Sequence, residues 1–216
     1  MNVRPVRLPL GPNGFARLSN VSRETLDRLS AYVQLLDQWN RRINLVGRNT
    51  IGDVWRRHIL DCAQLYPLLP RTTQTLVDLG AGAGLPGIVL AIMGVPQVHL
   101  IESDLRKAAF LREAIRITEV DATVHAGRIE QVPAFAADVI TARACADLST
   151  LLDLSEKFRG RRTVSVFLKG ASAAEELAAA SQQWEMRAEK IPSRSDSSGV
   201  ILKLDAVKRR ADHEPG

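Results

Sequence analysis

The chain has 216 residues, of which 45% are hydrophobic, enough for one α/β domain with a sizeable core and a modest appendage. No apolar run approaches the roughly 20 residues that a membrane span needs, and the N-terminal stretch MNVRPVRLPLGPNG lacks the apolar core of a signal peptide. The two cysteines, Cys62 and Cys145, form no C-x-x-C pair and suggest no disulfide framework. We therefore expect a cytoplasmic protein without membrane contact.

Positive charge is concentrated in the N-terminal third. Residues 1–74 hold 11 arginines and 5 acidic residues, a balance of +6, whereas the whole chain carries only +5. Arginine suits bidentate contacts to phosphate and to guanine. A nucleic-acid partner and a chance imbalance on a solvated surface explain this charge equally well at this point.

The first third of the chain is expected to be helical. Residues 1–20 are rich in Pro, Gly and Arg and are expected to form a mobile basic arm. A small helical extension that binds substrate should follow over 21–70. Within it, Ser22 predicts the N-cap of a helix over 22–40, and a second helix should run over 50–66.

The second predicted helix carries Arg57, His58, Asp61 and Cys62, and two interpretations of this segment are open. In the structural one, Arg57 and Asp61 form an i,i+4 pair on an exposed face while His58 and Cys62 pack inward. In the functional one, Arg57 and His58 touch the substrate. No second ligand pair has metal-binding spacing, so no metal is expected. Spacing alone favours the structural interpretation.

A glycine-rich loop is the strongest functional signal. The segment TLVDLGAGAGLPGIVLA (75–91) joins a short buried strand to a helix through Gly80, Gly82, Gly84 and Gly87. Glycine is needed where the backbone takes φ > 0 or where a ligand approaches without a Cβ in the way. A strand, a glycine turn and a helix N-terminus together predict a nucleotide-binding loop.

The residues around this loop favour S-adenosylmethionine (SAM) over a dinucleotide. The last three glycines fit G-x-G-x-x-G, and Glu102 ends the next apolar run as a ribose-binding acid should. However, Asp78 would bring a carboxylate close to a pyrophosphate, and Pro86 removes a backbone N–H that would hold it. SAM carries no phosphate and tolerates both residues. A tight turn without any ligand remains the alternative.

Strand and helix patterns alternate through residues 71–206, the predicted SAM-binding domain, and imply a parallel sheet covered by helices on both faces. A closing antiparallel hairpin is expected near the end of this region, and residues 207–216 are expected to be a disordered tail. Further strands are predicted over 98–101, 122–125, 137–141, 164–168, 185–191 and 200–204. Helices are predicted over 105–117, 148–158 and 173–184.

Candidate site residues follow the carboxyl ends of these strands, where parallel sheets bind ligands. Each of them also has a structural explanation, such as a surface charge or a helix-start acid. Their convergence on one edge of the sheet favours the functional interpretation. In chain order, they are Gly80, Gly82, Gly84, Leu85, Glu102, Ile129, Glu130, Arg143 and Lys169.

Taken together, these segments resemble the bacterial small-subunit rRNA guanine-N7 methyltransferase family, also called glucose-inhibited division protein B. The resemblance covers residues from about 30 to 170 in the right order, and G-x-G-L-P-G with R-H-x-x-D upstream is a specific combination. The matching segments are Arg57-His58-Ile59-Leu60-Asp61, then 78–87 (DLGAGAGLPG), Glu102-Ser103, Arg128-Ile129-Glu130, Arg143-Ala144 and Leu168-Lys169-Gly170.

The resemblance implies a Rossmann-like class I SAM-dependent methyltransferase fold and methylation of N7 of guanine 527 in the 530 loop of 16S rRNA. It also implies that the Arg57-to-Asp61 segment faces substrate, which reverses the preference from spacing alone. The implied partner is 16S rRNA or the small ribosomal subunit, bound by a monomer. The resemblance implies that the SAM site is lined by Gly80, Leu85, Ile129, Glu130 and Arg143, with Glu102 at the ribose. The glycine motif itself adds Asp78, Gly82 and Gly84 to the expected cofactor-binding residues.

The chemistry of such a reaction needs no general base, because N7 of guanine already carries a free lone pair. We therefore expect catalysis by positioning, with Arg143 orienting SAM and the base while Lys169 and the N-terminal helices hold phosphates. Three alternatives stay open: a SAM methyltransferase for another RNA, a small molecule or a protein; a nicotinamide-dependent oxidoreductase; and a non-catalytic RNA-binding module.

Overall fold

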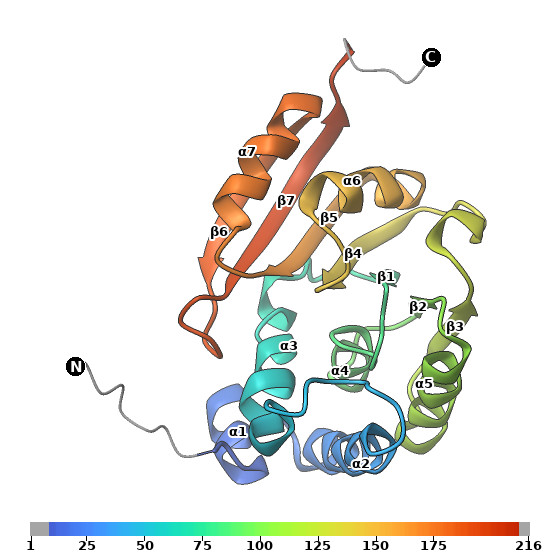
Figure 1. Ribbon diagram of the computed structural model, residues 1–216, viewed down its shortest axis with the longest axis vertical. Coiled ribbons are helices and arrows are strands. Elements are labelled where there is room, and N and C mark those ends of the chain that lie inside the picture. Colours follow the sequence, from blue (N-terminus) through green and yellow to red (C-terminus); the bar gives the residue numbers. More distant parts are fainter. Residues whose placement is uncertain (1–8, 212–216) are drawn as a thin grey trace.

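A seven-stranded β-sheet forms the centre of the protein in the computed structural model, which describes residues 9–211 (Figure 1). Its strands are β1 (Leu76–Leu79), β2 (Val98–Glu102), β3 (Ala122–Ala126), β4 (Ala137–Arg143), β5 (Arg159–Lys169), β6 (Trp184–Pro192) and β7 (Val200–Arg209). They lie in the order β3-β2-β1-β4-β5-β7-β6. β1 to β5 are parallel, whereas β7 runs antiparallel to both β5 and β6. The predicted parallel sheet with a closing hairpin is confirmed.

Helices cover both faces of this sheet. The α-helices are α1 (Pro12–Ser19), α2 (Arg23–Asn40), α3 (Asp61–Ala63), α4 (Gly87–Ile92), α5 (Leu105–Thr118), α6 (Leu148–Ser155) and α7 (Ala173–Gln183). Side chains alternate along β1, so that Leu76 joins a core shared with α2, α4 and α5 while Val77 joins a core shared with α6 and α7. Because both faces are covered, all four residues of β1 are buried.

The N-terminal region differs from the expected arm. Residues 12–19 form α1, in which Phe15 is fully buried with its ring 5.5 Å from that of Trp55. The backbone N–H of Leu10 donates to Asp53 at 2.8 Å. The prediction of a mobile arm is therefore wrong for 12–19, while residues 1–8 lie outside the described part. Ser22 caps α2 as predicted, accepting from the Thr25 N–H at 3.1 Å.

The second predicted helix is helical but irregular. It divides into a 3₁₀ turn η1 (Ile51–Asp53), a π-helix η2 (Trp55–Leu60) and the short α3, and a further turn η3 (Tyr66–Leu68) follows. A π-helix is rare and is often found at functional sites. Here it carries Arg57 and His58, two of the residues singled out from the sequence.

The C-terminal hairpin extends beyond its predicted end. β7 continues to Arg209, whose side chain donates to Asp153 at 2.7 Å and to Glu156 at 3.3 Å. The predicted start of a disordered tail at residue 207 is therefore wrong, because 207–209 belong to β7, and Lys208 and Arg209 pair with β6. Residues 212–216 lie outside the described part. At its other end, the hairpin turns through a loop that reaches back to α3 (Figure 1).

Candidate active site

The loop over residues 80–87, which we call the glycine loop, has the backbone that its sequence requires. Gly80, Gly82 and Gly84 have φ of 61°, 55° and 79°, in the left-handed region that favours glycine. A Cβ on Gly84 would lie 2.4 Å from Cγ1 of Ile88 in α4, so this glycine also permits a close approach. The sharp turn between β1 and α4 therefore depends on these residues.

Asp78 supports the glycine loop from beneath. Its fully buried carboxylate accepts the Gly87 N–H at 2.9 Å through Oδ2 and the Thr141 hydroxyl at 2.8 Å through Oδ1. Burial raises the pKa of this carboxyl to about 7. Because Pro86 has no N–H and that of Gly87 is already bonded, the start of α4 has little to offer a phosphate. This geometry supports the argument against a dinucleotide, and it places Asp78 below the surface of the loop.

The N-terminal helices also hold the glycine loop. Tyr32 of α2 is fully buried, and its hydroxyl donates to the carbonyl oxygen of Ala83 at 2.5 Å. The sequence placed Tyr32 only on an apolar stripe, and nothing in its spacing could identify its partner 51 residues away. The extension is therefore connected directly to the loop that the motif predicted.

Glu102 closes the same edge of the sheet. Its carboxylate accepts the Gly82 N–H at 2.9 Å and the Asp104 N–H at 2.7 Å. Each carboxylate oxygen has a second lone pair that these bonds leave free. Gly127 of the neighbouring strand end donates to the Glu102 carbonyl at 3.0 Å, and Ile129 and Glu130 follow in the turn η4 (Ile129–Gln131). The structure thus brings the residues predicted after β2 and β3 to one place.

Arg143, at the end of β4, is held in position by His58. Its Nη2 lies 2.5 Å from Nδ1 of His58, and Nε2 of the same ring lies 2.8 Å from the Thr50 hydroxyl. Because a guanidinium can only donate, Nδ1 must accept, so the ring is neutral with its proton on Nε2. Burial, reinforced by Arg143 and Arg57, lowers the pKa of His58 to about 3. Both ring nitrogens are thus engaged within the protein.

The carboxylate of Asp61 contacts four other side chains. It accepts from Arg143 at 3.4 Å, from Gln64 at 3.1 Å and from Ser193 at 3.3 Å, and it makes a short hydrogen bond with Ser195. The predicted i,i+4 pair between Arg57 and Asp61 is wrong, because Arg57 instead pairs with Asp196 at 2.6 Å. The hairpin loop 193–199 supplies these partners and covers the face that was expected to be exposed. His58 and Cys62 pack inward as predicted.

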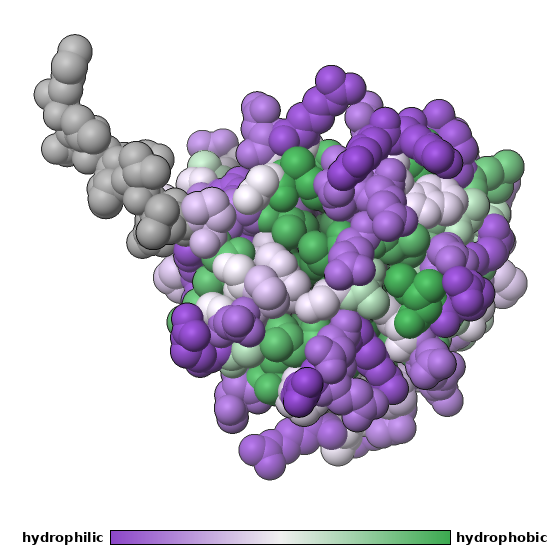
Figure 2. All heavy atoms as spheres, turned by 90° about the horizontal axis from the view of Figure 1, so that it is seen from below, coloured by the Kyte–Doolittle hydropathy of each residue, from purple (hydrophilic) through white to green (hydrophobic). Residues whose placement is uncertain are grey.

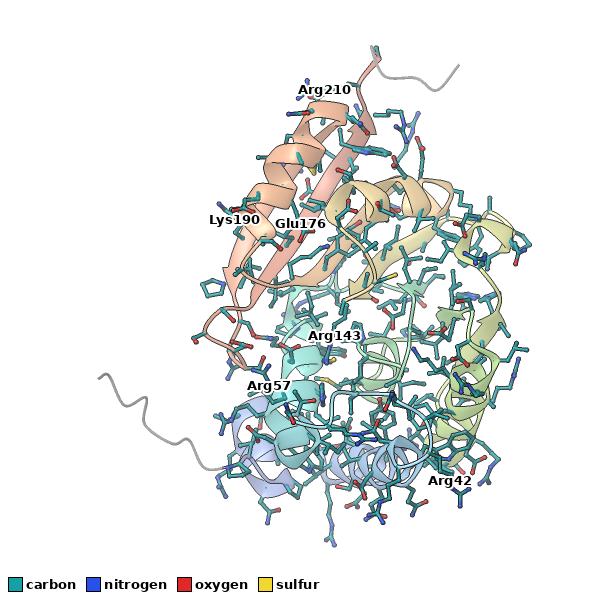
Figure 3. The ribbon with its side chains drawn as sticks, viewed as in Figure 1. Arg42, Arg57, Arg143, Glu176, Lys190 and Arg210 are labelled. Atoms are coloured by element: carbon teal, nitrogen blue, oxygen red, sulfur yellow. The ribbon has the colours of Figure 1, made fainter. Side chains whose placement is uncertain are left out.

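These residues surround a cavity of about 350 Å³, which we call the Arg143 cavity. Three of its lining residues, Arg57, Arg143 and Glu176, are labelled in Figure 3. Its walls come from η2 and α3, from the ends of β4 and β5, and from the hairpin loop. It therefore brings Arg57 and His58, predicted as one segment, together with Arg143 and Lys169, which were predicted from two other strand ends. The contribution of 193–199 was missed, because a segment reading SRSDSSG has only the composition of a turn.

The cations of this cavity are all paired. Arg57 binds Asp196 at 2.6 Å, Arg143 binds Asp61 at 3.4 Å, and Lys169 binds Glu176 at 2.7 Å. The Lys169 side chain is only 7% exposed and also donates to a backbone carbonyl. The prediction that Lys169 holds a phosphate therefore does not match its surroundings. The cavity is polar but close to electrically balanced.

The glycine loop and the Arg143 cavity adjoin each other. Ala144 and Ala146 line the cavity, and Cys145 between them packs so closely on Gly80 that a Cβ there would lie 2.5 Å from the sulfur. A ligand on the glycine loop and one in the cavity would therefore be neighbours. Among residues 9–211, no three His, Cys, Asp or Glu side chains gather into a metal-binding group.

The fold and this site define a class I SAM-dependent methyltransferase: a sheet with one antiparallel strand beside β5, a glycine loop after β1 and an acid at the end of β2. The model of the family described as rRNA small subunit methyltransferase G matches residues 25–198. The chain belongs to this family.

Relatives agree with this assignment. The chain is 57% identical over 196 residues to Ribosomal RNA small subunit methyltransferase G of Rhodospirillum centenum, covering 91% of each chain. It is 52% identical to the protein of that name from Rhodospirillum rubrum, covering 92% of this chain and 98% of the relative.

Two solved structures share the fold at low sequence identity. Cofactor-bound Rv0187 from MTB superposes with a TM-score of 0.59 at 16% identity, over 92% of this chain and 98% of that one. TYW2 of M. jannaschii in complex with AdoMet gives 0.55 at 17% identity, over 79% of this chain and 80% of that one.

Proposed function

We propose that this protein transfers the methyl group of SAM to N7 of guanine 527 in the 530 loop of 16S rRNA. The observation that carries the proposal is that Cys145, which packs on Gly80 of the glycine loop, lies between Ala144 and Ala146, which line the Arg143 cavity. A methyl donor on the loop and an acceptor in the cavity would then be neighbours, in a chain whose relatives are named for methylation of small-subunit rRNA.

SAM would lie along the edge formed by the ends of β1, β2 and β3. Gly80 and Gly84 shape the turn, and Gly82, where the nearest atom to an added Cβ would lie 3.8 Å away, would let the methionyl part approach the backbone, with Leu85 beside it. Glu102 would accept from the ribose hydroxyls with its free lone pairs, as acids at this position of doubly wound sheets do. Ile129 and Glu130 would contact the adenine. Asp78 would act indirectly by fixing the loop.

The target guanine would enter the Arg143 cavity. Its near balance of charge suits a neutral polar base better than a phosphate, and its hydrogen-bonding groups can meet a base edge. A base must leave its stack to reach such a site, as in other enzymes that modify bases. O6 of guanine lies beside N7 and accepts hydrogen bonds, so the guanidinium of Arg143 would orient the base by donating to it.

Methyl transfer to N7 then requires alignment alone. The N7 lone pair attacks the methyl carbon, the carbon–sulfur bond breaks, and the positive charge passes from the sulfonium to the purine ring. No proton is removed at N7. This agrees with His58, whose two nitrogens are both bonded, and with Asp78, which is buried under the loop. Orientation of this kind supplies on the order of 7–11 kcal/mol in favourable cases.

The rRNA would be bound by a monomer in the cytoplasm. Within residues 9–211 no helix combines the length and apolar character that crossing a bilayer needs. The N-terminal third of the chain carries the arginine excess, and its residues Arg57, His58 and Asp61 border the cavity, which suits this region to a polyanionic substrate.

The decisive experiment incubates the protein with labelled SAM and 30S subunits that lack the modification, then maps the labelled nucleoside. We expect 7-methylguanosine at position 527. Label in another RNA or only in a small molecule would reject the proposed substrate. Absence of SAM binding would instead favour a non-catalytic RNA-binding module.

A further inference from the structure

The three cations that line the Arg143 cavity are already paired, although an RNA substrate also needs cations for its phosphates. An RNA strand carries one negative charge per phosphate, and proteins gain much of their affinity for it by placing unpaired Lys or Arg along the backbone. Arg57, Arg143 and Lys169 each already face a carboxylate. An RNA strand with its target base in this cavity would therefore need other residues to bind the phosphates that flank the base.

A second hollow, which we call the α2–α5 groove, has the required residues. It has a volume of about 580 Å³ and lies between the end of α2, the residues that follow it and the first turns of α5. Trp39, Ile43 and Ala109 form an apolar lining. Three arginines surround it: Arg41, Arg42 and Arg106.

The arginines of the groove outnumber the acids near them. Arg41 pairs with Asp37 at 2.7 Å, and Arg106 with Asp104 at 2.9 Å, but neither acid lines the groove. Arg42 is exposed and forms no ion pair within residues 9–211. Guanidinium groups beside a partly exposed indole are a combination that binds nucleic-acid strands.

The groove also lies on the functional side of the molecule. Arg106 follows Glu102 by four residues, at the carboxyl edge of the sheet. From Arg42 the chain runs on to Thr50, which lines the Arg143 cavity and contacts His58. Eight residues of chain span at most about 29 Å. Arg42 and Thr50 are therefore no farther apart than this, a distance that one short stretch of RNA would cover.

Figure 3 shows where the labelled arginines of the groove and the cavity lie. In Figure 3, Arg57 and Arg143 lie near α3 while Arg42 lies beside α5, with the connecting loop between them. Figure 2 shows the underside of the molecule, where hydrophilic side chains surround smaller apolar patches.

We propose that the α2–α5 groove binds the sugar–phosphate backbone of the rRNA next to the target guanine, with Arg42 as its principal phosphate ligand. This inference rests on the proposed function, because it assumes an RNA substrate. Its apolar lining favours a nucleic-acid strand over a small free anion, since ribose and base surfaces can pack on Trp39 and Ile43. An acidic protein surface is the competing occupant, and the test separates the two.

The test measures affinity for protein-free 16S rRNA as a function of salt, using Arg42→Glu and Arg42→Ala. We expect Arg42→Glu to weaken binding at least about tenfold at low salt, and Arg42→Ala to reduce the slope of log K against log[salt] by about 0.7–0.9. SAM affinity should not change. The matched control is Arg162→Glu, the same reversal at an exposed arginine of β5 that lies seven residues, about 23 Å of strand, before Lys169.

Each outcome decides the matter. If Arg42→Glu binds rRNA as tightly as Arg162→Glu does, the proposal is wrong. If Arg42→Glu weakens binding to 30S subunits but not to protein-free rRNA, the groove holds a protein and the proposal is again wrong. The wild-type protein could methylate no rRNA while Arg42→Glu still selectively lost RNA affinity. That result would reject the proposed function and support RNA binding by the groove.

Discussion

The glycine loop and the Arg143 cavity are neighbours, joined through Cys145, yet they are built in different ways. The loop is a local structure, set by left-handed backbone at Gly80, Gly82 and Gly84 within one strand–turn–helix unit. The cavity depends on side chains from distant segments, since Arg57 and its partner Asp196 lie 139 residues apart. The glycine loop is therefore determined by local backbone conformation, and the Arg143 cavity by side-chain pairing between distant segments.

This difference predicts two kinds of sensitivity. Substitutions in the loop should alter stability and cofactor affinity, because the loop's conformation is part of the fold. Substitutions in the cavity should alter turnover, because its side chains hold a reacting base. The predictions below test that separation, beginning with the largest expected effect.

Arg143→Ala should reduce methyl transfer by about 10²–10³-fold, the usual cost of losing one aligned donor in an active site. RNA affinity should change little, because Arg143 already faces Asp61 and His58. Single-turnover rates with saturating 30S subunits measure the effect. Arg57→Ala, which removes a cation from the same cavity, serves as the comparison and should cost less. Normal turnover in Arg143→Ala would refute its orienting role.

Gly84→Ala should destabilise the protein by about 3 kcal/mol. A left-handed conformation costs an L-residue about 1–2 kcal/mol, and the new methyl group would also collide with Ile88. Gly82→Ala is the matched control, because its φ is also left-handed but its nearest neighbour would lie 3.8 Å away. Urea titration of both variants measures the difference. Equal losses would show that the close packing of α4 on the loop is unimportant.

The same contrast explains which features the sequence could predict. Ser22 as a helix cap and the glycines of the turn follow from local backbone requirements, and they are found as expected. The Arg57–Asp61 pair was wrong because i,i+4 spacing assumes a regular α-helix, whereas η2 is a π-helix and the hairpin loop offers other partners. Phe15 likewise becomes ordered through Trp55, a contact that no local pattern encodes.

The contributions of the two halves of the site to the stability of the fold should change with pH in opposite directions. The folded-state pKa of Asp78 is raised to about 7, so its contribution to stability is greatest below about pH 4 and declines as the pH rises to 7. The folded-state pKa of His58 is lowered to about 3, so its contribution is present above about pH 6.5 and declines as the pH falls. Between pH 4 and 6.5 the two effects oppose each other.

Single variants separate these effects. The difference in unfolding free energy between wild type and Asp78→Asn should fall as the pH rises from 4 to 7, and that between wild type and His58→Asn should fall as the pH drops from 6.5 to 4. The steepest slope expected is about 1.4 kcal/mol per pH unit. Denaturant titrations at half-unit intervals measure both. Slopes of the same sign would contradict the assignment of a buried acid to one half and a buried neutral imidazole to the other.

Tyr32→Phe tests the link between the two architectures, because this side chain is a long-range contact that fixes the local loop. Removing its hydroxyl leaves the Ala83 carbonyl without its partner and should cost about 1–2 kcal/mol of stability. SAM affinity should fall in parallel, since the loop loses its support from α2. Tyr66→Phe, at a 40% exposed position, is the control and should change stability by less than about 0.5 kcal/mol. If Tyr32→Phe lowered stability while SAM affinity stayed at the wild-type value, the N-terminal helices would support the core without positioning the glycine loop.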